Sequence, residues 1–336
     1  MDATIESTTT LAPDQVASSE DAPPRLWLGG LGAGIAWLAA ALVVEFWPNF
    51  DDWAYTTELA SAAGALGGGL LFASVAGRRL PGIDRLRSLA PWLVALALLL
   101  TSWEIFTAKL NLLPRPFFAP PQAFLEVYFE DWRRLGECVI RSLLLLAPGF
   151  FIGAALGFAS GVALGWSRIA GYWGHPILRL IGPLPAIAWL PIAFFAFPSS
   201  WSASVFLIAL ASGIPVAILT WSGVAGVNSA FYDIARTLGA SQRFLVLKVA
   251  VPAAMPHVFV GLFMGLASSF SVLVVAEMMG VKAGLGWYLQ WAQGWAAYGN
   301  MYAALLVMAV MCSGLVTLLF KIRDRLLAWQ KGLLRW

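Results

Sequence analysis

The sequence predicts an all-α protein that crosses a membrane about eight times, and three observations lead to this fold class. Of the 336 residues, 60% are hydrophobic and only 12% are charged, whereas soluble domains carry about 25% charged residues. Uncharged apolar runs of about 20 residues recur, and each is long enough to cross a bilayer as a helix. Arginines gather at the ends of these runs, so the net charge of +3 reflects topology rather than affinity for nucleic acid.

Eight apolar runs are expected to form the spanning helices. They cover residues 26–47, 57–77, 89–109, 142–166, 180–198, 203–222, 257–279 and 302–320. Residues 1–24 are rich in Ser, Thr, Ala, Pro and acidic residues, lack a signal-peptide pattern, and are interpreted as a disordered cytoplasmic tail. Arginines in the loop 78–87 and basic residues after Lys321 place both termini in the cytoplasm by the positive-inside rule.

The segment 121–137, expected on the outer side, admits two interpretations. It forms either a helix on the outer membrane interface or a plain connecting loop. In the helical case one side carries Phe124, Val127, Tyr128 and Trp132. The sequence favours neither.

Five glycines stand four residues apart in the span 142–166. They are Gly149, Gly153, Gly157, Gly161 and Gly165. At 100° per residue each step drifts by about 40°, so they trace a slowly winding stripe along which another helix approaches closely with right-handed crossing. The stripe predicts helix packing rather than chemistry. The alternative is that glycine is simply common in membrane helices.

The span 180–198 contains three prolines, Pro183, Pro185 and Pro191. Each removes a backbone donor and bends the helix, which is tolerated at membrane depth only where protein or a watery cavity receives the freed carbonyls. A broken helix therefore indicates a pathway wall, to which we assign Pro185, Trp189 and Pro191. A kinked helix without a functional part is the alternative.

Ionisable residues within the spans are few. Glu45 and Glu104 lie near helix ends, where they are expected to reach interfacial water, and Glu277 closes the seventh span in VVAEMMG. A carboxylate facing lipid is costly, so Glu277 is either a pathway residue or an end-of-helix acid that reaches the exterior. Ser268, Ser269 and Ser271 either line the same face or bond back to their own helix.

The sequence offers little enzymatic chemistry. None of the five lysines follows a glycine, so the chain has no Gly-Lys-Ser/Thr loop for ATP. Two cysteines and two histidines lie without partners at ligand spacing, and no Ser, His and acid arrangement is apparent. We therefore expect neither a catalytic residue nor a metal or cofactor in this chain.

The stretch DIARTLGASQRFLVLKVAVP, residues 233–252, interrupts the apolar chain with polar, helix-forming sequence. Asp233 near its start and Arg236 further along suit a helix dipole. Gly239 and Ala240 leave close access for a partner, and Pro252 marks the start of the next helix. The residues alone predict either a helix that docks another protein or a solvated loop.

This stretch resembles the cytoplasmic loop of inner-membrane permease subunits of ABC importers, in which Glu-Ala-Ala is followed at fixed spacing by Gly and by Ile-x-Leu-Pro. Asp233, Ile234 and Ala235 match the start, Gly239 follows in register, and residues 249–252 close the motif. Five ordered segments are similar to the nitrate, sulfonate, taurine and bicarbonate group of these permeases. They are LPAIAWLPI (184–192), ARTLGAS (235–241), VPAAMPHVFVGL (251–262), VVAEMMG (274–280) and GLGWYL (284–289).

Three features depart from the group. Asp233 and Ile234 replace Glu and Ala, which shortens the acid and adds bulk. Ala196, Phe197 and Pro198 stand where the group has Trp-Phe-Gly, so the substrate does not follow by analogy. The hairpin 26–77 lies outside the usual six-helix permease.

The resemblance implies a six-helix type I ABC importer permease over residues 88–330, with a cytoplasmic coupling helix near 232–244 and an added N-terminal hairpin and basic loop over 25–87. It implies a bacterial inner membrane, a second permease copy, two cytoplasmic ATPases that bind ATP and Mg, and a periplasmic binding protein. The solute implied is a small anion of the sulfonate, taurine, nitrate or bicarbonate type. The residues implied to couple to the ATPase are Asp233, Ala235, Arg236, Leu238, Gly239, Ala240, Ser241 and Pro252.

Two other classes of function compete with the importer. An ion-driven secondary transporter usually shows internal repeats with buried acids or interrupted helices in matching halves, and the sequence shows no such repeat. A membrane scaffold or lipid-modifying enzyme is the other, and the enzyme lacks a catalytic cluster.

Overall fold

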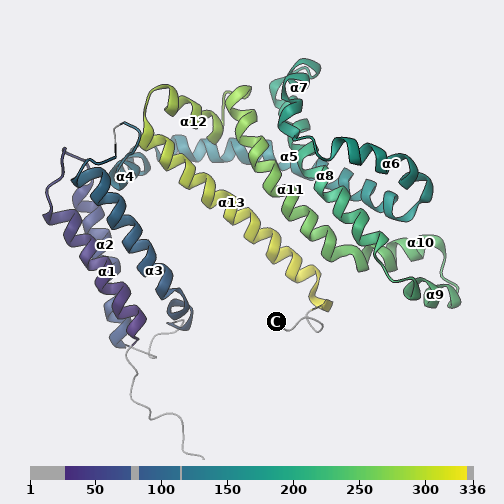
Figure 1. The fold of residues 1–336 in the computed structure, drawn as a ribbon, viewed down its shortest axis with the longest axis horizontal. Helices are drawn as coiled ribbons and strands as arrows, with labels where there is room; N and C mark the ends of the chain where they lie inside the picture. Colours follow the sequence, from purple (N-terminus) through teal and green to yellow (C-terminus); the bar gives the residue numbers. More distant parts are fainter. Residues whose placement is uncertain (1–26, 77–82, 114–115, 331–336) are drawn as a thin grey trace, which may run out of the picture. The chain divides into compact units, whose positions relative to one another are not determined.

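The computed structural model describes residues 27–76, 83–113 and 116–330, and every regular element in these ranges is a helix (Figure 1). The predicted tail 1–24 and residues 78–82 of the predicted basic loop lie outside the described residues. The chain forms two compact units. The first ends at Leu113 and also includes Pro120–Gln122, and the second comprises Pro114–Ala119 and the chain from Ala123 onwards.

The first unit is a bundle of three helices. Helix α1 (Leu28–Phe46) packs against α2 (Thr56–Ala76) and against α3 (Ile83–Glu104), which continues into the π-helical turn η2 (Ile105–Lys109). Glycines allow the first two helices to touch, because a Cβ on Gly67 would lie 2.9 Å from the Leu38 amide nitrogen. The sequence groups α3 with the permease core, and in the structure α3 packs within the first compact unit.

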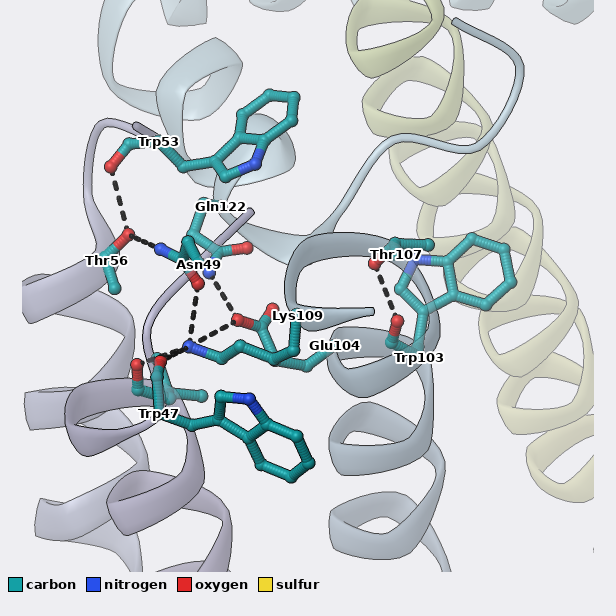
Figure 2. Close-up of polar contacts among 10 residues, drawn as sticks. Trp47, Asn49, Trp53, Thr56, Trp103, Glu104, Thr107, Lys109 and Gln122 are labelled. Atoms are coloured by element: carbon teal, nitrogen blue, oxygen red, sulfur yellow. Dashed lines mark hydrogen bonds and ion pairs between the residues drawn. The ribbon is translucent and has the colours of Figure 1, made fainter. Parts of the chain in front are cut away.

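Lys109 ties η2 to the end of α1 (Figure 2). Its ammonium donates to the carbonyl oxygens of Val44 and Trp47, at 2.8 and 2.6 Å, and to Asn49 Oδ1 at 2.7 Å. Carbonyls at a helix C-terminus lack intrahelical partners and carry a partial negative charge, so a buried cation is well placed there. Lys109 therefore caps α1 with two hydrogen bonds and binds the Asn49 side chain with a third.

Glu104 completes this buried polar cluster. Its Oε1 lies 3.5 Å from Lys109 Nζ and accepts a 2.7 Å hydrogen bond from Gln122 Nε2. The residue is only 1% exposed. The expectation that Glu104 reaches interfacial water is therefore wrong. Lys109, on the same helical run, supplies the opposite charge that offsets the burial of the Glu104 carboxylate.

Three helices form the centre of the second unit. Helix α8 (Ser200–Ala225) packs against both α5 (Trp132–Trp166) and α11 (Val251–Met279). Leu207, Ile208 and Val216 of α8 are fully buried. Burial of such aliphatic side chains and close contact between the helices together stabilise the packing of α5, α8 and α11.

The five regularly spaced glycines of α5 face α8. A Cβ on Gly149 would lie 2.6 Å from Ile208 Cγ2, one on Gly161 2.6 Å from the Ala217 carbonyl oxygen, and one on Gly153 2.8 Å from Ala209 Cα. Gly157 and Gly165 meet Val216 and Val224 in the same way. The backbones approach so closely that no side chain larger than hydrogen fits along the stripe.

A second set of glycines, on α11, meets an adjacent and partly shared face of α8. A Cβ on Gly265 would lie 2.8 Å from the Ser212 carbonyl oxygen, and one on Gly261 3.1 Å from Val216 Cα. Helix α8 thus makes close backbone contact with glycines of two helices. The second face escapes the sequence analysis because two glycines four residues apart are common in membrane helices.

Residues 121–137 form a helix followed by the start of another. Helix α4 (Pro121–Glu130) ends before Asp131, and α5 begins at Trp132. Val127 of α4 is buried in a cluster with α12 (Leu285–Gly294) and α13 (Tyr298–Leu326), and the Tyr128 hydroxyl donates to the Ala303 carbonyl oxygen at 3.0 Å. The helical alternative is therefore correct for 121–130, but Val127 and Tyr128 face protein rather than the membrane interface.

The predicted span 180–198 is broken. Helix α6 (Arg168–Ile181) ends at Gly182, and after a turn the chain continues as η3 (Ala186–Trp189) and α7 (Leu190–Ala196), bent by 88° from α6. Among the described residues, seven helices are long and apolar enough to cross a membrane, and this bent pair makes an eighth if it counts as one span.

Candidate functional site

The polar stretch 233–252 lies on two short helices rather than one. Helix α9 (Ser229–Thr237) ends in a turn, and α10 (Gln242–Phe244) follows it (Figure 1). Asn228 begins α9 by accepting a 3.0 Å hydrogen bond from the Ala230 amide, and Ser241 begins α10 through the Phe244 amide at 3.4 Å. Side-chain caps of this kind satisfy amides that have no intrahelical partner. The single coupling helix predicted near 232–244 is therefore replaced by a helix, a turn and a new helix start.

Gly239 makes the turn between the two helices. Its φ is +81°, a left-handed conformation that glycine adopts without the steric cost of a Cβ. The Gly239 amide donates to the Arg236 carbonyl at 2.9 Å and the Ala240 amide to the Ala235 carbonyl at 3.0 Å. This pair of bonds is the Schellman pattern that ends a helix at a glycine. A Cβ on Gly239 would meet no atom within 4 Å. The motif therefore requires glycine here for its backbone conformation and not for lack of space.

Tyr232 fastens α9 to the membrane helices. Its ring packs edge-on against Trp166 at the end of α5, with centroids 5.6 Å apart. The same cluster contains Val224 of α8 and the buried Ala250 and Ala254 at the start of α11. Burial raises the pKa of the Tyr232 phenol, so this side chain stays neutral. The sequence analysis assigns no role to Tyr232, because the contact joins residues 66 positions apart.

The opposite side of α9 carries exposed apolar side chains. Phe231, Ile234 and Leu238 are spaced by three and four residues, and Leu238 is 82% exposed. Residues at this spacing share one face of a helix. Asp233 and Arg236 lie off this face and pair with each other at 3.3 Å in an exposed contact. The segment therefore presents an unburied apolar face with a polar margin.

Pro252 lies in the first turn of α11, where the sequence predicts a helix start, although the chain before it is also helical. The helical run begins at Gln242, passes through the π-helical turn η4 (Leu245–Ala250) and continues into α11. The Val251 amide donates to the carbonyl of Val246, five residues back. A proline lacks an N–H and crowds the carbonyl four residues earlier. The wider π turn just before Pro252 accommodates both defects.

The proline-rich residues assigned to the pathway wall lie at the bend between α6 and α7. Pro185 precedes η3 and accepts from the Ala188 amide at 2.9 Å, and Pro191 occupies the first turn of α7, where its missing N–H costs nothing. Both prolines are exposed. Trp189 is half-buried and packs against the main core of the second unit. The prolines thus define the break, and Trp189 anchors it.

The three serines of α11 divide between two faces. Ser269 is buried, and its hydroxyl donates to the Ile208 carbonyl oxygen of α8 at 3.4 Å. Ser268 and Ser271 are exposed on another side of the helix. The structure therefore does not bring all three together on one face.

Glu277 holds the start of α12. Its Oε2 accepts a 2.7 Å hydrogen bond from the Gly286 amide, in the first turn of that helix, and the residue is 1% exposed. The chain reverses at Gly284, whose φ is +102°. A carboxylate at a helix N-terminus meets unpaired amides and the positive end of the dipole. In this conformation Glu277 faces neither lipid nor an open surface of the chain.

A polar cluster on the second unit was not identified from the sequence. The Tyr288 hydroxyl donates to Asp131 Oδ2 at 2.6 Å and accepts from Asn300 Nδ2 at 2.7 Å. The Arg134 guanidinium lies 4.1 Å from the ring centroid of Trp291. Burial raises the pKa of Tyr288 well above its usual range, so the phenol remains a donor. The cluster joins α5, α12 and α13.

No group of three or more His, Cys, Asp or Glu side chains is placed to hold a metal ion in the described part of the chain. The features that the structure brings out are an exposed segment with capped helix ends, a broken span and helices in close backbone contact.

Comparison with known proteins gives consistent matches. Residues 149–330 match the family model described as the binding-protein-dependent transport system inner membrane component. The chain is similar to the nitrate import permease protein NrtB of Synechococcus elongatus, with 27% identity over 73% of this chain and 89% of that protein. It is also similar to the bicarbonate transport system permease protein CmpB of the same species, with 33% identity over 58% and 68% of the two chains.

A probable ABC transporter permease protein of Brucella abortus is 29% identical over 74% of this chain and 98% of its own length. Among solved structures, the MetNI methionine ABC transporter in an inward-facing conformation gives a TM-score of 0.46 at 18% identity. That match covers 60% of this chain and 95% of the other.

Proposed function

The chain belongs to the family of binding-protein-dependent transport system inner membrane components and is the permease subunit of an ABC importer, and from this premise we propose how it couples to its motor. The family works with a separate ATPase and a substrate-binding protein. We propose that the exposed face of α9, formed by Phe231, Ile234 and Leu238, docks on that ATPase, which binds ATP and Mg. The side carrying α9 is then cytoplasmic, as are both termini.

One observation carries the docking proposal. The segment from Asn228 to Phe244 is exposed and apolar on one face, yet its conformation is fixed by side-chain caps and by the Gly239 turn. An exposed apolar patch on an ordered element is typical of an interaction site. Docking such a preformed element costs little conformational entropy.

Two routes connect this segment to the membrane. Ser241 leads through α10 and η4 directly into α11, and Tyr232 contacts Trp166 at the end of α5. A force applied to α9 by closing ATPases would therefore reach α5 and α11, the two helices that pack against α8. We propose that this movement opens and closes the pathway.

The pathway is proposed to form between two copies of the permease. Ser268 and Ser271 support this arrangement, because they expose hydroxyl groups on a spanning helix of the single chain. Polar groups in membrane helices usually face a partner or a watery route. Pro185 and Pro191 at the broken span are assigned to the same wall, where freed carbonyls require protein or water.

The proposed cargo is a small oxyanion handed over by a periplasmic binding protein. Both cyanobacterial relatives are named for such ions, nitrate and bicarbonate. Sulfonates and taurine belong to the same chemical class of small solutes with an anionic oxygen-bearing group. The substrate class thus rests on the relatives.

Co-purification of the permease with its ATPase tests the docking proposal. Leu238→Asp places a charge on the exposed face and is expected to abolish recovery of the ATPase, because desolvating that charge at an apolar contact is costly. Ser229→Asp, at an exposed position of the same helix that lies off the apolar face, serves as the matched control and should retain the ATPase. Undiminished recovery with Leu238→Asp would show that α9 is not the docking element.

A further inference from the structure

A cavity of about 640 Å³ lies where the end of α5, the start of α6 and the end of α8 meet. Six of its lining residues carry polar or aromatic groups. They are Trp166, Ser167, Arg168, Tyr172, His175 and Trp221. Of these residues, Trp166 also takes part in the coupling contacts described above, through Tyr232.

His175 lines the cavity and carries an unsatisfied polar atom. Its Nε2 is buried and has no hydrogen-bond partner among the described residues. The imidazole packs against Trp221, with ring centroids 4.2 Å apart and ring planes tilted by 40°, and lies over Gly171, where a Cβ would be 3.3 Å from Cε1. A buried polar atom without a partner is unfavourable, so an oxygen-bearing ligand that pairs with Nε2 would stabilise the site.

The charge of the lining favours an anion. Arg168 and His175 are seven residues apart on α6 and therefore lie on the same face, two turns from each other. No Asp or Glu is found among the lining residues of the described structure. A guanidinium forms paired hydrogen bonds with phosphate oxygens. The positive end of the α6 dipole lies at the cavity, and the negative ends of α5 and α8 lie there too, so Arg168 supplies the main attraction for an anion.

The surroundings of the cavity favour a lipid over a soluble ion. One side of α6 exposes a continuous apolar stripe formed by Ile169, Tyr172, Trp173, Ile177 and Leu180. The helix has 14 residues and turns through 88° before α7, so it is too short to cross a bilayer alone. A short helix with apolar and aromatic residues on one side and cationic residues on the other is typical of the membrane interface.

We infer that this cavity binds the phosphate group of an anionic phospholipid in the leaflet that faces the ATPase. The inference rests on the proposed function only in assigning that leaflet to the cytoplasmic side. Trp166 lines the cavity and also packs on Tyr232 of α9. A bound headgroup therefore supports the contact that fastens the coupling segment to the membrane helices.

Native mass spectrometry of the full chain in mild detergent, titrated with phosphatidylglycerol, tests this site. One tightly bound lipid is expected per chain, and Arg168→Gln should weaken that binding about fivefold, the effect of about one cationic contact with an anionic lipid. His175→Phe should weaken it too, because the ring is kept while the imidazole donor is lost. Arg179→Gln, on the same helix but outside the cavity lining, is the matched control and should leave the affinity unchanged.

Three results would overturn the inference. They are equal affinity for phosphatidylcholine, displacement of the lipid by millimolar inorganic phosphate, and unchanged binding in both cavity variants. Melting temperatures measured without added lipid show whether each variant is folded. If Arg168→Gln does not fold, Gly171→Ala replaces it, since its Cβ crowds His175 and should weaken lipid binding. These outcomes do not depend on whether α9 docks on an ATPase.

Discussion

The coupling segment and the central bundle are ordered by different means. Helices α9 and α10 are exposed, and their conformation depends on Asn228, Ser241 and the positive φ of Gly239. Helices α5, α8 and α11 are ordered by backbone contact, which permits no side chain at Gly153 or Gly265. Substitutions in the segment should therefore impair coupling with little loss of stability, whereas substitutions in the bundle should destabilise the whole unit.

The largest effect is expected from Gly153→Leu. A Cβ at this position would lie 2.8 Å from Ala209 Cα, so α5 and α8 must separate, at a cost of about 3 kcal/mol in the free energy of unfolding. Thermal denaturation in detergent measures the change. Gly136→Leu is the matched control on the same helix, where a Cβ meets no atom within 4 Å, and a similar loss there would contradict the packing explanation.

The next largest effect is expected from Glu277→Ala. The substitution leaves the buried Gly286 amide without its acceptor, at a cost of about 2 kcal/mol in stability. Glu277→Gln retains an oxygen acceptor and should lose less than half as much in the same denaturation assay. If Ala is harmless while Gln abolishes transport, Glu277 acts in the pathway rather than as a cap for α12.

Gly239→Val should separate coupling from stability. A β-branched residue is strained at φ +81°, and a left-handed conformation costs about 1–2 kcal/mol for a residue with a Cβ. The turn between α9 and α10 should shift, so ATP-driven uptake falls while the melting temperature stays unchanged. Gly239→Asn tolerates the same φ and should retain most of the uptake. Equal loss with Val and Asn would indicate that a partner surface, not the turn, requires glycine.

The smallest effect is expected at the ion pair of Asp233 and Arg236. Both side chains are more than half exposed, and such pairs contribute about 0.2–1 kcal/mol. Arg236→Gln should therefore change the melting temperature negligibly. A double-substitution cycle with Asp233→Asn measures the interaction, and a coupling well above this range would place the pair in a buried network.

The spans and the glycine stripe were predictable because their signals are local. An apolar run of 20 residues identifies a membrane helix by itself, and glycines repeated every four residues, such as Gly149 and Gly153, occupy one side of a helix wherever its partner lies. Asn228 also carries a local signal, since asparagine is a favoured residue immediately before a helix, but the sequence analysis did not use it.

The remaining features depend on contacts between distant residues. Lys109 caps α1 through carbonyls about 60 residues earlier, and Glu277 meets α12 only because the chain reverses at Gly284. The π turn before Pro252 forms because the proline lies within a helical run, and tertiary packing keeps that run helical on both sides of it. Pattern and propensity do not encode such contacts, so the exposed position of Glu104 was predicted wrongly. The single coupling helix was wrong for a local reason, because Gly239 ends α9 and Ser241 begins α10.

Cysteine cross-linking tests most directly whether the exposed face of α9 contacts the motor. Leu238→Cys is introduced into a chain whose Cys138 and Cys312 are replaced by alanine, and the assembled importer is treated with a short bifunctional thiol reagent. The account predicts a cross-link to the ATPase from Leu238→Cys and none from Leu180→Cys. A Leu238→Cys chain that forms no cross-link in an importer still active in ATP-driven uptake would contradict it.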